Sequence, residues 1–210
     1  MGKNNQEILQ GAAVELKLDS SQLYIFSPLL QRGVDVYGQV GVSITEFLCQ
    51  QIGASPEYVE KRIQTIFLNG KPVDDEDLAI LSDGDTLALS ASMPGALGAT
   101  MRKGGFFSPL RYQISHTPEE KTPTVVDGIV TLKLFNIILK ELAGLVLSRG
   151  ISVDGGPLAE LLARQGEVFW KGLREISVDG KIVDREEISK VDWSGRNVLV
   201  KVEVTDASLA

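Results

Sequence analysis

The sequence has one cysteine, one histidine and only 6% aromatic residues among its 210 positions, and these scarcities limit its chemistry. With Cys49 alone no intrachain disulfide can form, so a reducing cytoplasm is the expected location. The place of Cys49 in an apolar helical pattern favours a buried thiol over a reactive one. A single histidine, His116, removes most metal-site and general-base schemes. No apolar run approaches the ~20 residues of a membrane span, and the N-terminal residues lack the apolar core of a signal peptide. We therefore expect a cytoplasmic protein with no membrane partner.

Positive charge is also scarce. The chain has 21 Lys and Arg against 28 Asp and Glu, a net charge of -7, which argues against nucleic acid and favours a protein partner. There is no zinc-ligand spacing, no phosphate-binding glycine motif and no nucleophile elbow. The densest acidic run, residues 74–77, is typical of a solvated loop rather than of a cation site. We therefore expect a non-enzyme, with no catalytic residue, metal site or cofactor.

What the sequence does contain is an internal repeat. Residues 139–204 repeat the pattern of residues 30–91: residues 31–36 return as 148–153, and residues 69–74 return as 179–184. A chain of this length suits two small domains. The repeat predicts domains at residues 12–92 and 129–205, joined by a glycine-rich basic linker at 93–128.

The second repeat has the clearer pattern. The alternating run 129–135 predicts a strand, and Asn136 predicts the start of a short helix that ends before Gly144. A strand ends at 151–153, and a main helix follows from Pro157 with Leu158, Leu161 and Leu162 on one face. The Asp179-Gly180 pair predicts a hairpin, and residues 198–204 predict the closing strand.

The first repeat follows the same order. Strands are expected at 14–18, 33–36, 66–68 and 86–90, with an Asn69-Gly70 hairpin turn. Ser43 and Glu46 form a capping box that opens a helix with Ile44, Phe47, Leu48 and Ile52 on its apolar face. Pro28 predicts that the counterpart of the short helix is irregular. The order strand, strand, helix, strand, strand predicts an α+β chain of two tandem β-grasp domains, each a mixed sheet wrapped on one main helix.

Three stretches resemble the ubiquitin-like β-grasp sulfur carriers, namely the small subunit of molybdopterin synthase and the thiamine-biosynthesis carrier. Residues 139–144, directly after a predicted strand, look like the family's Leu-Arg-Glu-Leu-Ala-Gly stretch. Residues 68–73 and 81–89 are similar to its Val-Asn-Gly and Asp-Gly-Asp turns. The likeness covers most of both repeats, and the shared order and spacing carry it.

The resemblance implies a flexible glycine-ended tail whose terminal carboxylate is activated and loaded with sulfur. Pro94, Gly95 and Gly98 stand where the family has its tail, but the chain continues beyond them, and residues 202–210 contain no glycine. Two hypotheses follow. The first is a non-catalytic protein-binding or scaffold module; the second is a diverged or precursor sulfur carrier that needs cleavage near Gly98 or Gly105.

The linker is a second candidate site. Arg102, Lys103, Gly104, Gly105 and Arg111 form a basic, glycine-rich stretch in an acidic protein. They could bind an anion or a partner through glycine amides and guanidinium groups. Alternatively, this is a connector whose basic residues dock on the acidic surfaces of the domains. The linker's apolar residues could dock on a β-grasp surface, in the same chain or across a homo-oligomer: Met93, Leu97, Met101, Phe106 and Phe107.

Overall fold

The computed structural model describes residues 12–117 and 124–205, which form two compact units. Unit 1 combines the N-terminal part of the chain, up to Val34, with the part from Ala143 onward, and unit 2 is the continuous stretch Asp35–Leu142. Both units are α+β. Their composition differs from the predicted ranges 12–92 and 129–205, because each unit contains strands from both repeats. Residues 118–123 of the predicted linker lie outside the described residues.

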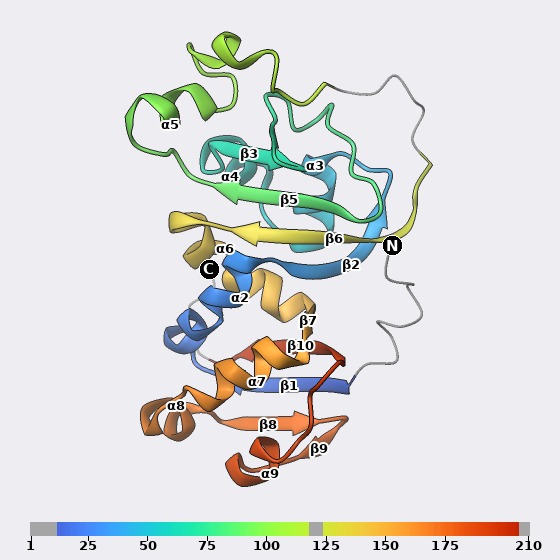
Figure 1. Cartoon of the computed structure of the whole chain (residues 1–210), viewed down its shortest axis with the longest axis vertical. Coiled ribbons are helices and arrows are strands. Elements are labelled where there is room, and N and C mark those ends of the chain that lie inside the picture. Colours follow the sequence, from blue (N-terminus) through green and yellow to red (C-terminus); the bar gives the residue numbers. More distant parts are fainter. Residues whose placement is uncertain (1–11, 118–123, 206–210) are drawn as a thin grey trace. The chain divides into compact units, whose positions relative to one another are not determined.

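Unit 2 has a five-stranded sheet with the order β4-β3-β5-β6-β2. Strand β3 is antiparallel to both β4 and β5, whereas β5 is parallel to β6, with Leu87 opposite Leu132 (Figure 1). The last strand of the first repeat thus lies beside the first strand of the second. The elements are β2 (Val34–Val40), α3 (Ile44–Glu46), the π-helical η2 (Phe47–Ile52), α4 (Pro56–Lys61), β3 (Thr65–Leu68), β4 (Lys71–Pro72), β5 (Asp85–Ser90), α5 (Gly95–Met101), the 3-10 helix η3 (Ser108–Arg111), β6 (Val126–Leu134) and the first half of α6 (Asn136–Arg149), within which the two units divide.

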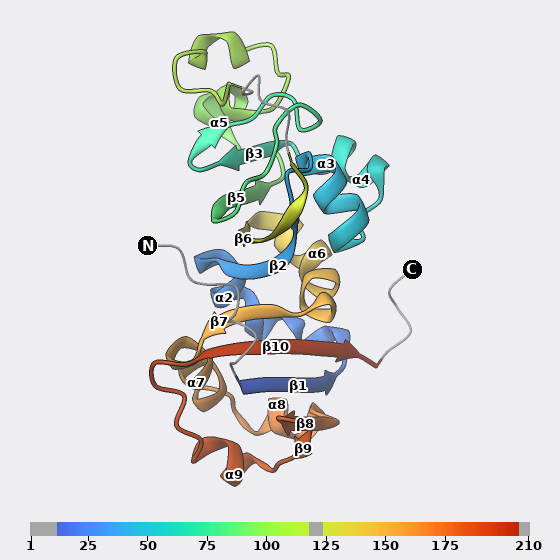
Figure 2. The same ribbon diagram turned by 90° about the vertical axis from the view of Figure 1, so that its right-hand side faces the viewer.

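The capping box, the apolar helix face and the hairpin turn that were predicted for residues of unit 2 are confirmed. The Ser43 Oγ accepts from the Glu46 amide at 3.1 Å, and a Glu46 carboxylate oxygen accepts from the Ser43 amide at 3.0 Å, so the capping box is complete. The four predicted apolar residues of this helix are buried, and α3 and α4 cover one face of the sheet (Figure 2). Asn69 and Gly70 have φ of 51° and 77°, as a two-residue hairpin turn of type I′ requires.

Unit 1 has the order β7-β10-β1-β8-β9. Strand β1 lies between two strands of the second repeat: it is parallel to β10, with Leu16 opposite Val202, and antiparallel to β8, with Leu16 opposite Ile176. Strand β10 is in turn antiparallel to β7. The elements are β1 (Ala12–Leu18), the 3-10 helix η1 (Ser20–Phe26), α2 (Ser27–Arg32), β7 (Ile151–Asp154), α7 (Gly155–Ala163), α8 (Glu167–Gly172), β8 (Glu175–Val178), β9 (Lys181–Ile182), α9 (Arg185–Ser189) and β10 (Asn197–Val204).

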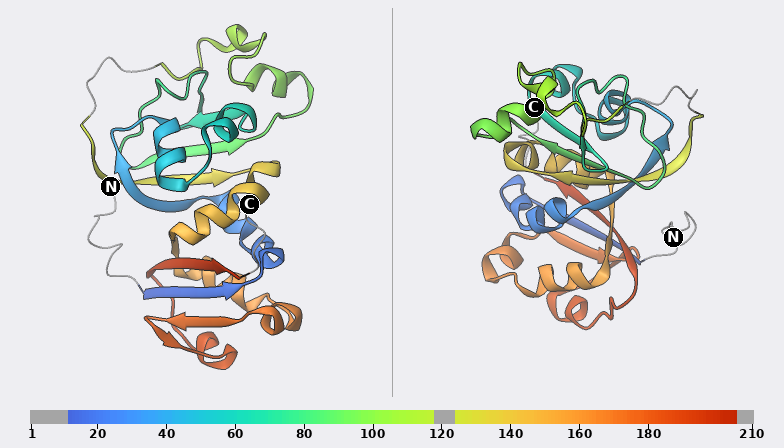
Figure 3. Two further views of the ribbon diagram at one scale, coloured as in Figure 1. Left: turned by 180° about the vertical axis from the view of Figure 1, so that it is seen from behind. Right: turned by 45° about the horizontal axis from the view of Figure 1, so that its top comes forward.

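The core of unit 1 lies between this sheet and α7, which runs along one face of β10 and β1 (Figures 1 and 3). The alternation of β1 and β10 puts every second side chain into the core, and the predicted apolar face of α7 meets them; the buried residues are Val14, Leu16, Leu18, Leu158, Leu161, Leu162, Val198, Val200 and Val202. Asp179 and Gly180 have φ of 51° and 76°, so the second predicted hairpin is confirmed.

Two expectations need correction. Pro28 does not make its region irregular, because it lies in the first turn of α2, where the missing amide is tolerated. Helix α6 does not end before Gly144 but continues to Arg149 and stops at Gly150, whose φ is 100°. Burial of Val146 and Leu147 explains the extra turn, since packing outweighs the low helix propensity of one glycine. The linker also contains ordered structure, α5 and η3.

Candidate functional site

The predicted site residues all lie on residues 93–117, here named the connector segment. It follows the β4–β3 side of the unit 2 sheet, where α5 lies beyond β3 (Figure 1). The Lys103 amide donates to the Gln64 carbonyl oxygen at 2.9 Å, and the His116 amide donates to the Pro72 carbonyl oxygen at 2.8 Å. The segment is therefore hydrogen-bonded to the sheet region at two points 13 residues apart in the chain.

Arg111 is the main anchor of the connector segment. Its side chain is only 3% exposed, and its two terminal nitrogens donate to the two Asp74 carboxylate oxygens at 2.7 and 3.1 Å. Its Nε donates to the Thr100 carbonyl oxygen at 2.6 Å, and Nη1 also donates to Ser115 Oγ at 2.6 Å. A buried guanidinium with a bidentate carboxylate and further acceptors is well satisfied. Arg111 thus ties α5, η3 and the acidic run together.

The other candidate residues of the basic stretch have partners in the same unit. Lys103 forms an ion pair with Glu76, and its ammonium also donates to the Val59 carbonyl oxygen at 2.9 Å. Arg102 Nε donates to the Gln64 side chain at 2.7 Å, and the Gly104 amide donates to Asp74 Oδ1 at 3.1 Å. The acidic run 74–77 supplies both carboxylates. This geometry follows the connector interpretation, in which basic linker residues dock on an acidic surface.

The tail-like motif is part of a helix. Pro94 is the N-cap of α5, and Gly95 has a φ of 80°. Gly98 is buried inside α5, where an added Cβ would lie 2.0 Å from the Met93 carbonyl oxygen. Gly105 is less confined, since its Cβ would be 3.1 Å from the nearest backbone oxygen. The glycine at position 98 is therefore required by close packing.

The connector segment also exposes large apolar side chains. Phe106 is 90% exposed, and its ring meets that of Phe107 edge to face at 5.1 Å between centroids. The other exposed members are Leu97, Phe107, Leu110, Tyr112 and Ile114. Of the five apolar residues expected to dock, Met93 and Met101 are half-buried, whereas Leu97, Phe106 and Phe107 face solvent. The connector segment is thus held in place by a buried arginine and exposes apolar side chains to solvent, which is typical of a surface that binds another molecule.

Sequence reasoning missed a second polar cluster in unit 2. The Tyr58 hydroxyl donates to Glu141 Oε2 at 2.8 Å, and Arg62 forms an ion pair with the same carboxylate. Hydrogen bonding from Arg62 lowers the pKa of Glu141, and burial together with the Glu141 contact raises the pKa of Tyr58. The cluster joins α4 to α6. It could not be predicted because Glu141 lies about 80 positions from Tyr58 and Arg62 in the chain.

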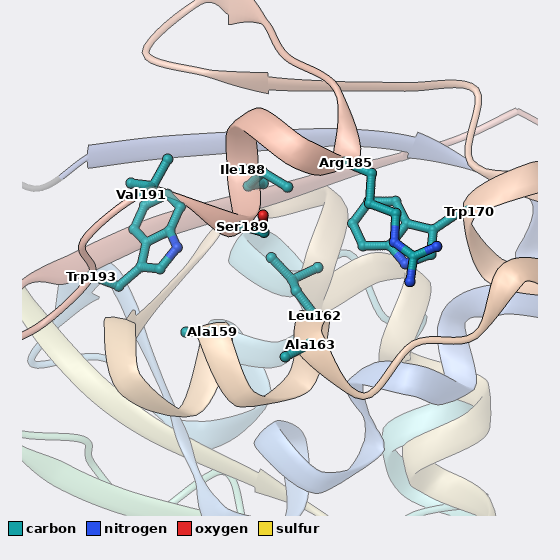
Figure 4. Close-up of a pocket in the computed structure, with 9 residues that line it drawn as sticks. All are labelled: Ala159, Leu162, Ala163, Trp170, Arg185, Ile188, Ser189, Val191 and Trp193. Atoms are coloured by element: carbon teal, nitrogen blue, oxygen red, sulfur yellow. The ribbon is translucent and has the colours of Figure 1, made fainter.

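Unit 1 contains a pocket of about 330 Å³ that was not expected from the sequence (Figure 4). Arg185 lies over the ring of Trp170, with its guanidinium carbon 5.4 Å from the ring centroid. Trp193 lies at the other end. The lining residues come from α7, α8, α9 and the turn after α9: Ala159, Leu162, Ala163, Trp170, Arg185, Ile188, Ser189, Val191 and Trp193. In the sequence, the one feature that could have pointed to this pocket is that both tryptophans of the chain lie within residues 170–193.

Other chemistry is limited within the described ranges. Cys49 is half-buried rather than fully buried, and desolvation raises the pKa of its thiol, which makes the reactive thiolate scarcer. Across residues 12–117 and 124–205, no three His, Cys, Asp or Glu side chains gather into a group that could hold a metal ion. In those same ranges no helix has the length and apolar character to span a membrane. Comparison with protein-family models, curated proteins and solved structures finds no match for the chain.

Proposed function

We propose that this protein is a non-catalytic protein-binding module built from two sulfur-carrier-like β-grasp units, and that the outer apolar residues of the connector segment contact the partner. The β-grasp part is supported by strand order. In each unit two parallel strands lie inside the sheet, β5 with β6 and β10 with β1, and an antiparallel pair flanks them. Both units thus have a hairpin at one edge next to a parallel pair, but the pair is reversed: the closing strand β5 lies beside β3 in unit 2, whereas the opening strand β1 lies beside β8 in unit 1.

One observation carries the binding function: Phe106 is 90% exposed on a segment that a buried Arg111 holds in place. Exposing an aromatic side chain forgoes about 2 kcal/mol of burial free energy. Because Arg111 already holds the connector segment in place, little further conformational entropy is lost when a partner binds Phe106. Aromatic anchors of this kind are the residues that dominate binding energy at protein interfaces. The partner that fits is a protein with an apolar groove.

The test compares two matched variants of the full chain. Phe106→Ser removes an apolar side chain from the connector segment, and Val168→Ser removes one from unit 1, where Val168 is 85% exposed. Tagged wild type and variants are used for quantitative capture from the native host, and light scattering measures self-association. We expect a partner, or a second copy, that Phe106→Ser loses at least ten-fold and Val168→Ser retains. An identical partner set for both variants would contradict the proposed surface.

The alternative function is a sulfur carrier released by cleavage near Gly98 or Gly105. The buried helical position of Gly98 weighs against it, because a carrier tail must be extended to enter an active-site channel. Intact-mass measurement on protein from the native cells separates the two functions. A species ending at Gly98 or Gly105 would favour the carrier, and a full-length mass alone would favour the binding module.

A further inference from the structure

The unit 1 pocket has the features of a small-molecule site, and the protein-binding surface in unit 2 makes no use of it. Its volume of about 330 Å³ falls at the lower end of the range for ligand sites. Seven of its nine lining residues are apolar or aromatic, and the polar ones are Arg185 and Ser189. A mainly apolar cavity with a few oriented polar groups is the usual form of such a site.

Trp193 provides the first oriented polar group. Its side chain belongs to a residue only 4% exposed, and its indole nitrogen points into the pocket (Figure 4). Among the described residues no acceptor bonds this Nε1–H, whereas the Trp170 Nε1–H donates to the Gln165 carbonyl oxygen at 3.2 Å. The Trp193 nitrogen is not among the buried polar atoms that lack a partner, so it reaches the accessible surface of the pocket. A tryptophan N–H at such a surface can donate to a ligand. An acceptor placed in the pocket would supply the partner.

Arg185 provides the second group, at the opposite end of the pocket (Figure 4). Three other basic residues of this region pair with carboxylates four positions away: Arg164 with Glu160, Lys171 with Glu167, and Lys190 with Glu186. Within the part of the chain that the structure describes, no carboxylate pairs with Arg185, and its guanidinium lies against the Trp170 ring. The cation–π contact with Trp170 holds the guanidinium beside the pocket and leaves its N–H donors for an anion.

We propose that this pocket binds a small planar aromatic carboxylate that carries a hydroxyl or carbonyl oxygen at its far end. The ring fills the apolar space beside Leu162 and Ile188, and the carboxylate accepts from Arg185. The distal oxygen accepts from the Trp193 Nε1–H. A neutral ligand would leave Arg185 without its anion, and an aliphatic acid would lose the aromatic contacts with Trp170 and Trp193. The pocket therefore selects for ring, charge and distal oxygen together.

The test uses the two tryptophans as reporters, since the chain has no others and a ¹H–¹⁵N spectrum of the full chain shows one indole signal for each. The probe is 4-hydroxycinnamate, and 4-hydroxycinnamide is its uncharged counterpart. Trp193→Phe assigns the signals and removes the distal donor while keeping a ring. Arg185→Gln removes the charge, and Arg164→Gln is the matched control outside the pocket. The backbone amide signals report in the same spectrum whether each variant is folded.

We expect a saturable shift of the Trp193 indole signal with 4-hydroxycinnamate. The amide, and the acid added to Arg185→Gln, should each bind about ten-fold more weakly, because one charge-assisted hydrogen bond is lost. Arg164→Gln should bind like wild type. Either of two results would overturn the proposal. The first is the absence of a saturable shift of either indole signal at about 10 mM probe, a concentration at which a Kd of 1 mM gives about 90% occupancy. The second is that the acid binds wild type no more tightly than the amide does, and no more tightly than it binds Arg185→Gln.

Discussion

Replacing Leu16 by alanine should destabilise unit 1 and leave unit 2 intact. The Leu16 side chain is 1% exposed and lies on β1, opposite Val202 of β10 and Ile176 of β8. Removing the buried side chain of a leucine costs its transfer free energy and leaves a cavity, which together amount to about 3 kcal/mol. This is a large fraction of the stability of a small unit.

Hydrogen exchange read by mass spectrometry gives the location of the effect. A loss of about 3 kcal/mol corresponds to roughly 100-fold faster exchange of amides that open with unit 1. We expect this acceleration in β8 and β10, at the far end of the sequence, and not in β3 and β5. Lys17→Ala is the control on the same strand. Lys17 points outward and pairs with Glu175 at 3.0 Å in a half-exposed ion pair, so its removal should change exchange little.

The opposite pattern would refute this reasoning. If Leu16→Ala accelerated exchange in β3 and β5 while β8 and β10 kept their protection, β1 would belong with residues 65–90. The cooperative units would then be the two sequence repeats, 12–92 and 129–205. An equal effect of Lys17→Ala would show that the change arises from strand β1 fraying rather than from loss of the buried side chain.

Three further predictions concern unit 2. Arg111→Met should cost about 2 kcal/mol, because the Thr100 carbonyl oxygen and Ser115 Oγ lose a charged donor; residues 95–115 should then lose exchange protection, whereas the exposed Arg174→Met should have little effect. Gly98→Ala should loosen α5, since its Cβ would lie 2.0 Å from the Met93 carbonyl oxygen; limited proteolysis measures this, and resistance equal to wild type would contradict the packing. Glu141→Gln should lower the melting temperature. The pKa of Glu141 is depressed below its ordinary 4.5, so its stabilisation is present above about pH 4.5 and disappears as the pH falls through the lowered value. The difference in melting temperature between Glu141→Gln and wild type should therefore shrink as the pH falls below about 4.5.

The elements set by local chemistry could be predicted from the sequence. The capping box of Ser43 and Glu46 and the two hairpin turns depend on residues within three positions of one another, and the structure has each of them where it was expected. Helix α6 was predicted too short because Gly144 is a breaker by propensity alone. Its continuation depends on the burial of Val146 and Leu147, which only the tertiary structure determines.

The pairing of strands could not be predicted in the same way. The alternation of Val14, Leu16 and Leu18 identifies a strand with one buried face, but it fits either repeat equally well. The sequence repeat suggested that β1 belongs with its own copy, whereas the structure places it between β8 and β10. The partner of Arg111 was open for the same reason, since Asp74 lies 37 positions away and many carboxylates were available.

The candidate site was predicted in position and not in detail. Basic, glycine-rich and apolar residues at 93–111 indicated a stretch with a role beyond connection, and both an anion site and a docked connector were consistent with them. The partners of Arg102, Lys103 and Arg111 distinguish these interpretations, and they include α4, Gln64 and the acidic run. The unit 1 pocket had no sequence signature, because its walls come from three helices and a turn.

The position of β1 also imposes an order on synthesis. Ala12 pairs with Val198, so the strand waits for 186 further residues before its parallel neighbour exists. At 5–20 residues per second a ribosome needs roughly 10–40 s to make them. Unit 2 is continuous in the chain and can fold in that interval, while β1, with its alternating apolar face, has no sheet to join. The nascent chain therefore carries an unpaired aggregation-prone strand until β10 has been made, which makes β1 a segment that a chaperone would have reason to shield.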